Sequence, residues 1–302
     1  MALPLEQLAK GMTFIGKPVH ATLFPYPIAA TIHAARISVV YQNNCRAATA
    51  GSNAKLPWPT YIAGYLVMTW GGSVMTHFLL QLPPPMLYST TPYIIYLTTH
   101  LTLTLLFHLF PILLSPSSIA LLDTVLFPID ALVRTGAVTG TTAHLAPGSP
   151  VARPLITSPL THLIIGALAS AGGGLSASTL STWSPTWSFS TPPVLRAPTL
   201  TAFFWSSMDV WAGALVAAMY GVASGAQAFY GWQELLRLVG LGVAGIKEGA
   251  CVVGTPWMSQ LEAKALAAGV LAVFFGLRMY KVHWAGAAPA QQVKKAEKEK
   301  TG

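Results

Sequence analysis

Apolar residues fill this chain in long blocks instead of alternating with polar ones. Seven blocks have about the 20 residues that a helix needs to cross the hydrocarbon core of a membrane. They cover about 22–41, 59–82, 92–114, 117–140, 159–181, 199–224 and 264–283. Because a backbone inside lipid must satisfy its own hydrogen bonds, each block is predicted to be helical. The pattern therefore predicts an all-α polytopic membrane protein with seven transmembrane helices.

Proline-rich clusters separate several of the blocks and predict loops. They are "LPPP" at 82–85, "SPSS" at 115–118, "APGSP" at 146–150 and "TPP" at 191–193. The region 226–263 is different, because Glu234, Arg237, Lys247 and Glu248 interrupt its small and apolar residues. We interpret it as a loop or re-entrant segment, with an eighth span as the alternative.

Composition supports a membrane protein. Hydrophobic residues make up 53% of the 302 positions and charged residues only 9%, against about 25% in typical soluble domains. The net charge of +8 does not indicate nucleic-acid binding, because lysines gather in the tail 284–302 and no basic face with aromatics is evident. By the positive-inside rule this tail is cytosolic. Seven crossings then place the N-terminus on the other side of the membrane. The loop after the first span would be cytosolic, and the basic residues Arg46 and Lys55 expected there agree with that orientation.

An internal repeat organises the chain. An offset of 102 residues aligns "PWPTYIAGYLVMTWGG" (57–72) with "PLTHLIIGALASAGGG" (159–174), which matches Gly64 with Gly166 and the pair at 71–72 with the pair at 173–174. Three spans separate the two copies, so the second must cross in the opposite sense. We therefore expect, within 1–225, an N-terminal arm and two inverted three-helix repeats, 22–114 and 117–224, followed by a seventh helix at 264–283.

The glycine runs within the repeats are candidate pore or kink positions. Glycine-interrupted helices at matching places in two halves point to a transport pathway, and hydroxyls and bare carbonyls can replace ion hydration. The alternative is that small residues only let helices pack closely. The candidate residues are Gly71, Gly72, Gly172, Gly173, Gly174, Ser73, Ser170 and Ser176.

Charges inside the predicted spans form a second candidate group, because ionisable residues are costly in a membrane. Asp130 and Arg134 are four residues apart on one helical face. They form either a locally neutralised pair or a site where Arg134 lines the pathway or holds a lipid phosphate. Asp209 has no cation nearby in the sequence, and we expect Arg36 to be its partner. Alternatively, Arg36 extends to the interface, as we expect of Arg278.

No enzyme chemistry is evident. The eight histidines are scattered without the spacing of a metal pair, and Cys45 and Cys251 make no disulfide framework. No nucleophile–base set or phosphate-binding loop stands out. We expect no catalytic residues, no metal and no cofactor.

Four motifs resemble those of the trimeric intracellular cation (TRIC) channels. They are "LFPYPIAATIHAARISVVY" (23–41), "WPTYIAGYLVMTWGGSVMTHFLLQLPPP" (58–85), "DALVRTGAVTG" (130–140) and "GALASAGGG" (166–174), and the similarity covers about 20–225. The resemblance implies a homotrimer in which each subunit has a potassium pore between its two repeats. It also implies a phosphoinositide ligand at the fourth helix. There, Asp130 and Ala131 stand where the family has lysine and glutamate, which leaves Arg134 alone for that role.

The sequence thus predicts an intracellular-membrane potassium channel that supplies counter-ion flow for calcium release. The endings Lys298 and Lys300 resemble a dilysine retrieval signal, which favours the endoplasmic reticulum or another intracellular membrane. The expected partners are potassium ions, membrane lipids and further copies of the chain in a homotrimer, and no nucleic acid. A secondary transporter with inverted repeats and a non-conducting structural membrane protein are the alternatives.

Overall fold

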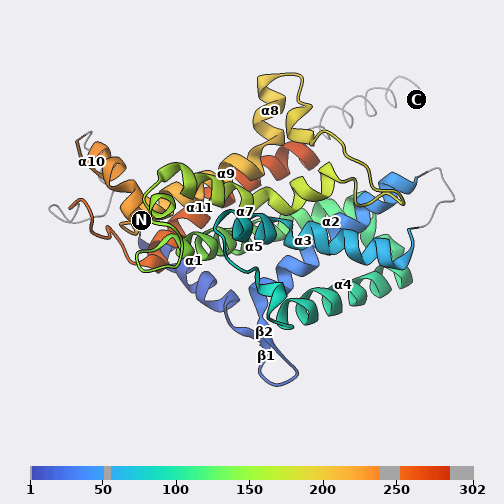
Figure 1. The fold of residues 1–302 in the computed structure, drawn as a ribbon. Coiled ribbons are helices and arrows are strands. Elements are labelled where there is room, and N and C mark those ends of the chain that lie inside the picture. Colours follow the sequence, from blue (N-terminus) through green and yellow to red (C-terminus); the bar gives the residue numbers. More distant parts are fainter. Residues whose placement is uncertain (1, 51–55, 239–251, 286–302) are drawn as a thin grey trace, which may run out of the picture.

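The computed structural model describes residues 2–50, 56–238 and 252–285, and the chain is mostly helical (76%). Its long helices lie side by side in one bundle (Figure 1). The small hairpin β1–β2 projects from the bottom of the view, and α8 projects from the top. These features agree with an all-α membrane protein.

The secondary-structure elements follow one another along the chain in a simple order. The N-terminal half contains α1 (Ala2–Ile15), β1 (Pro18–His20), β2 (Phe24–Pro27), α2 (Ile28–Thr49), α3 (Trp58–Leu79), η1 (Pro85–Leu87), α4 (Thr91–Leu109), η2 (Pro111–Leu114), α5 (Pro116–Thr142) and η3 (Ala143–Leu145). The C-terminal half contains α6 (Arg153–Ile156), α7 (Pro159–Thr179), η4 (Pro193–Leu195), α8 (Leu200–Ser206), α9 (Met208–Ala223), η5 (Gln227–Phe229), α10 (Tyr230–Leu238), α11 (Gln260–Met279) and the π-helical turn η6 (Tyr280–Trp284).

Each of the seven apolar blocks contains a long helix or, in the sixth block, a bent pair of helices. Three helical segments are long and apolar enough to cross a membrane: Pro116–Leu145, Pro159–Thr179 and Gln260–Trp284. The pair α8–α9, bent by 66°, makes a fourth if it is counted as one broken span. The described residues therefore give three to four candidate spans, and the seven expected from the pattern are not established.

The first predicted span is wrong at its N-terminal end. Residues 24–27 form strand β2, paired antiparallel with β1, and the helix begins only at Ile28. Pro25 and Pro27 explain the shift, because the residue before a proline avoids helical geometry. The helix then runs on to Thr49, which places Arg46 in its last turn and not in a loop. Lys55, the other charge expected in that loop, lies outside the described residues.

Helix α7 is the centre of the bundle, packed against α3 on one side and α9 on the other. Gly64, near the start of α3, faces Thr182 just beyond the end of α7. Leu80, just beyond the end of α3, clusters with Ile165 near the start of α7. The two helices are therefore antiparallel, as expected of repeat copies that run in opposite senses.

The largest buried apolar cluster lies between α5, α9 and α11. It contains Ala131 and Val138 from α5, Ala212 and Val216 from α9, and Leu271 from α11, among others. Helix α1, which the sequence pattern did not predict, packs against α11.

The region interpreted as a loop or re-entrant segment contains a short surface helix. Helix α10 projects at the left of Figure 1 and carries the exposed ion pair Glu234–Arg237, 2.7 Å long. The buried Gln233 fixes its base, since its amide donates to the carbonyls of Val222 (2.7 Å) and Thr255 (3.2 Å). Residues 239–251, with Lys247 and Glu248, and the tail 286–302 lie outside the described part of the chain.

Candidate functional site

The predicted glycines meet where α3 and α7 cross, and there they bring the two backbones into contact. A Cβ atom on Gly172 would lie 2.6 Å from the Cα of Gly72. One on Gly173 would overlap the carbonyl oxygen of Met68. Gly174, by contrast, has no atom within 4 Å of such a Cβ. Backbone therefore fills this crossing, which supports the close-packing interpretation; a role of these glycines in a pore stays a prediction.

Neither glycine run interrupts its helix, because α3 and α7 are each assigned as one α-helix through the run; a kink there stays a prediction. Ser176 lies at the crossing, and its hydroxyl bonds the carbonyl of Gly172 at 2.8 Å. Ser73 is on α3, with its hydroxyl 3.4 Å from Nδ1 of His77. Of the predicted serines, only Ser170 lies beside charged groups, as described next.

Charged side chains from three helices meet at Asp209. Its Oδ1 accepts from Nη1 of Arg134 (3.0 Å) and from Nη1 of Arg278 (2.8 Å). Arg134 also donates to the carbonyl oxygen of Ser170 at 2.8 Å, and its Nη2 lies 3.7 Å from Asp130. Both guanidinium groups lie over the ring of Phe275, 5.0 Å and 4.7 Å from its centroid. The two arginines therefore share one carboxylate and one aromatic face.

A second charged group forms between α2, α5 and the end of α11. Nη1 of Arg36 donates to Oδ1 of Asp123 at 2.6 Å, and Nε2 of His283 lies 2.9 Å from the other oxygen, Oδ2. His283 is placed by the π-helical turn η6, a feature that often occurs at functional sites. Arg36 and His283 thus converge on one carboxylate.

A cavity of about 240 Å³ connects the two groups, because residues from each group line it. The first group contributes Asp130 and Arg278, and the second contributes Arg36, Asp123 and His283. Together they are the charge network. It holds three arginines and three aspartates, whose formal charges cancel when His283 is neutral. Nε of Arg36 is buried without a partner in the described structure. Such groups are normally satisfied by water, and at roughly 30 Å³ per molecule the cavity has room for several.

One member of the charge network, Asp209, lies beside the break between α8 and α9. The two helices meet at Ser207 with a bend of 66°, and Asp209 is in the first turn of α9. Unpaired N–H groups make a helix N-terminus partly positive, which stabilises a carboxylate there. In transport proteins, discontinuous helices whose termini face the pathway recur at substrate and ion sites.

The network confirms one predicted pair and corrects another. Asp130 and Arg134 do pair, as their spacing predicts. The expected partnership of Arg36 with Asp209 is wrong, because α2 packs against α5 and delivers Arg36 to Asp123 instead. Arg278, expected as an interfacial anchor, points inward to Asp209. Its position was detectable, because Ala267, Leu271, Phe275 and Arg278 have helical spacing on one face of α11.

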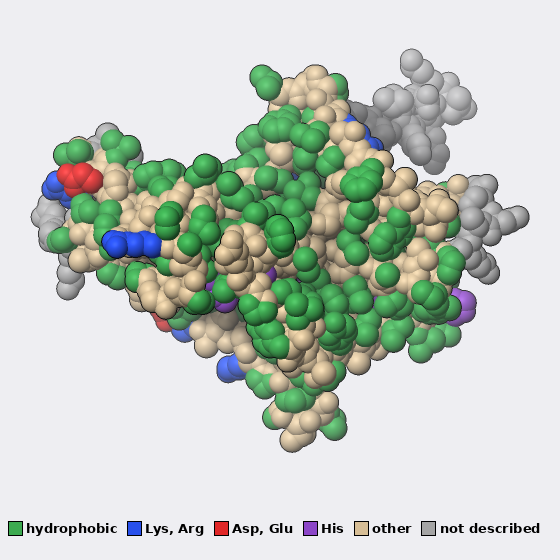
Figure 2. Space-filling view, in the orientation of Figure 1, with side chains coloured by type: hydrophobic (Ala, Val, Ile, Leu, Met, Phe, Trp, Pro, Cys, Tyr) green, Lys and Arg blue, Asp and Glu red, His purple; other side chains and the backbone are tan. Residues whose placement is uncertain are grey.

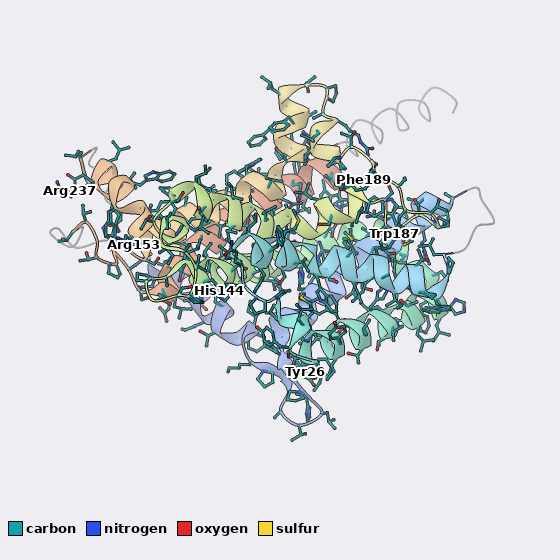
Figure 3. All side chains as sticks on the ribbon, viewed as in Figure 1. Tyr26, His144, Arg153, Trp187, Phe189 and Arg237 are labelled. Atoms are coloured by element: carbon teal, nitrogen blue, oxygen red, sulfur yellow. The ribbon has the colours of Figure 1, made fainter. Side chains whose placement is uncertain are left out.

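Charged side chains are sparse on the face of the molecule drawn in Figure 2. Figure 2 shows a face of hydrophobic and uncharged side chains, with acidic and basic atoms together over α10, where Figure 3 labels Arg237. Among the described residues, no group of three or more His, Cys, Asp or Glu side chains could hold a metal ion. No protein-family model, curated protein or solved structure matches the chain in the comparisons made. Evidence for its function therefore comes from the site and from the sequence motifs.

Proposed function

We propose that this chain is a channel for monovalent cations, principally potassium, in an intracellular membrane. The observation that carries the proposal is the charge network, in which six charged side chains, Asp209 beside a helix break among them, gather between apolar helices and are mostly shielded from solvent. Charges in such a place cost several kcal/mol and are retained where ions or protons pass.

The proposed route follows the cavity between α2, α5 and α11 and not the closed α3–α7 crossing. Asp123 and Asp130 on the cavity wall attract a cation, while the arginines hold the carboxylates in place between passages. Asp209 accepts from two arginines, so one can move away without leaving the carboxylate unpaired. In this proposal Arg134 is the gating charge, since it contacts α5, α7 and α9 partners at once.

The cellular setting follows from the resemblance to TRIC channels. It supports the proposal of a homotrimer in the endoplasmic reticulum, with a cytosolic C-terminus, that balances charge during calcium release. The antiparallel course of α3 and α7 supports the arrangement as two inverted repeats with seven spans. A bound phosphoinositide is not part of the proposal, because Asp130, Asp209 and Ser170 already engage the guanidinium of Arg134.

A secondary transporter is the second candidate, and the helix break favours it. In a carrier, Asp209 exchanges its two arginine partners as the α8–α9 pair changes its bend, so that the cavity opens to one side at a time. A non-conducting structural protein is the third, favoured by the close-packed glycines of α7.

Purified protein in a planar bilayer with a potassium gradient tests these functions. A channel gives discrete conductance steps, which Asp209→Asn reduces and the exposed control Glu234→Gln leaves unchanged. Saturable flux without steps assigns the chain to the transporters. A monodisperse protein without any flux is structural and overturns the proposal. Gly173→Leu is unsuitable for this test, because its side chain would overlap the Met68 backbone and disturb packing whatever the function.

A further inference from the structure

A second, larger cavity lies at one end of the bundle, away from the charge network. Its volume is about 450 Å³, and it is formed by the last turns of α2, the first turn of α3 and the last turn of α4. That volume is within the range of about 300–1,000 Å³ typical of pockets for small organic ligands. We call it the end cavity.

One part of the end cavity is apolar and aromatic. Leu56, Trp58 and Tyr61 line it, and Trp58 is 62% exposed. Tryptophan and tyrosine in such positions mark the level of lipid headgroups in membrane proteins. A ligand that enters the end cavity from the bilayer therefore meets a surface suited to an acyl chain.

The other part of the end cavity carries two basic residues, Arg46 and His108, without an acidic partner among the described residues. Arg46 lies in the last turn of α2 and His108 in the last turn of α4, and both line the cavity. Neither forms an ion pair with an acidic residue in the described part of the chain. The first turn of α3 adds the uncapped N–H groups of Trp58 and Thr60, which also favour an anion, whereas Pro59 between them has none.

A buried polar group marks the floor between these two parts. Gln42 lines the end cavity and is only 7% exposed. Its Nε2 donates to Oγ of Ser38 at 3.0 Å, whereas its carbonyl oxygen accepts no hydrogen bond from the described residues. Because this oxygen is not among the fully buried unpaired atoms of the described residues, it is open to the cavity and can accept from a ligand hydroxyl.

We propose that the end cavity binds an anionic single-chain lipid. Its phosphate or carboxylate lies between Arg46 and His108, a hydroxyl of its headgroup donates to Gln42, and its acyl chain lies over Trp58 and Tyr61. The site is separate from the charge network and does not depend on ion conduction.

Equilibrium binding of radiolabelled lysophosphatidate to the full chain in neutral detergent tests the site. The expected result is saturable binding that Arg46→Gln weakens about tenfold or more, as loss of a charge-assisted hydrogen bond requires. Arg153→Gln is the matched control, because Arg153 is also exposed but lies far from the end cavity, as Figure 3 shows, and should bind as wild type does. Gel filtration establishes that each variant is folded.

Competitors separate the headgroup from the chain. Unlabelled lysophosphatidate should displace the label, whereas neutral monooleoylglycerol and chain-free glycerol 3-phosphate should each do so at least tenfold less well. Equal displacement by either competitor overturns the proposal, since it assigns the site to a neutral lipid or to a free anion. Unchanged binding in Arg46→Gln overturns it as well.

Chemical modification of Cys45 is a second way to test where the lipid binds. It lines the end cavity, and Cys251→Ser leaves it as the only thiol. In the Cys251→Ser chain, bound lysophosphatidate should protect Cys45 from reaction with a small maleimide. In the same chain with Arg46→Gln added, it should not. Binding that is intact but leaves the modification of Cys45 unchanged places the lipid elsewhere.

Discussion

At the level of single residues, neighbouring glycines of α7 have different surroundings. Gly172 and Gly173 admit the backbone of α3, and Gly166 admits Gly213 of α9, whose carbonyl oxygen lies 2.7 Å from an added Cβ. Gly174 admits nothing. Each glycine costs about 1 kcal/mol against alanine in a helix interior, and only close approach to another helix offsets that cost. Packing therefore explains Gly166 and two of the three glycines in the run 172–174.

Alanine substitutions should separate these glycines. Gly174→Ala should stabilise the protein by up to about 1 kcal/mol, because it improves helix propensity without a clash. Gly173→Ala should destabilise it by about 1–3 kcal/mol, as overpacking does. Thermal unfolding in detergent measures both. Equal effects of the two substitutions would show that the helices do not touch at Gly173.

The pair Arg36–Asp123 should couple strongly, because both side chains are largely buried, with 16% and 27% exposed. Arg36→Gln leaves the Asp123 carboxylate with His283 alone, and we expect a loss of about 2 kcal/mol, less than for a fully buried pair because the site is partly exposed. Asp123→Asn in the same chain should recover part of that loss. Unfolding free energies of the four proteins in this double-mutant cycle test it, and additive losses would contradict direct pairing.

Among the helices, the break in the sixth apolar block is the feature that places Asp209. Two serines, Ser206 and Ser207, lie at the break. The hydroxyl of Ser207 donates to the carbonyl of Phe203 at 2.6 Å, and that of Ser206 donates to the same oxygen at 3.2 Å. Such side-chain bonds compete with the helical backbone and bend helices. The bend therefore has a local cause, although a hydrophobicity pattern does not show it.

Ser206→Ala together with Ser207→Ala should reduce the bend between α8 and α9, which is 66°. Spin labels at Leu200 and Tyr220, in a chain with both cysteines replaced by serine, report the change. A straight helix of about 20 residues spans about 30 Å, so the distance between labels should increase toward that value in the double variant. An unchanged distance would mean that tertiary packing, and not the serines, sets the bend.

How much of the structure was predictable depends on the range of the interactions. Long apolar blocks predict the main helices, because the apolar residues that a helix buries follow one another within a single block of the sequence. The pair Asp130–Arg134 was predictable because four residues separate its members. The pairs of Asp209 with Arg134 and Arg278, and of Asp123 with Arg36 and His283, depend on which helices pack together. Local pattern has no such information, and it also missed α1, the β-hairpin and the end cavity.

For the whole molecule, the packing of the helices bears most directly on how many times the chain crosses the membrane. Helix α3 runs antiparallel beside the apolar helix α7 over its length, so a membrane that contains α7 contains α3 as well. His77 and His144, at the ends of α3 and α5, have ring centroids 5.5 Å apart. The α3–α4 and α5–α7 loops therefore lie at the same end of the bundle. We expect seven crossings, although α2, α3 and α4 are not among the candidate spans.

Single cysteines in an otherwise cysteine-free chain test this topology. With seven crossings, Thr90→Cys and Ala146→Cys react with an impermeant maleimide from the same side of sealed vesicles, and Thr186→Cys reacts from the other. If only α5, α7, the α8–α9 pair and α11 cross, the first four helices lie outside the membrane, and Thr90→Cys reacts from the side of Thr186→Cys. All three positions are in described connections between helices, so detergent should make each react. The side on which Thr90→Cys reacts therefore decides between four crossings and the seven that two inverted repeats require.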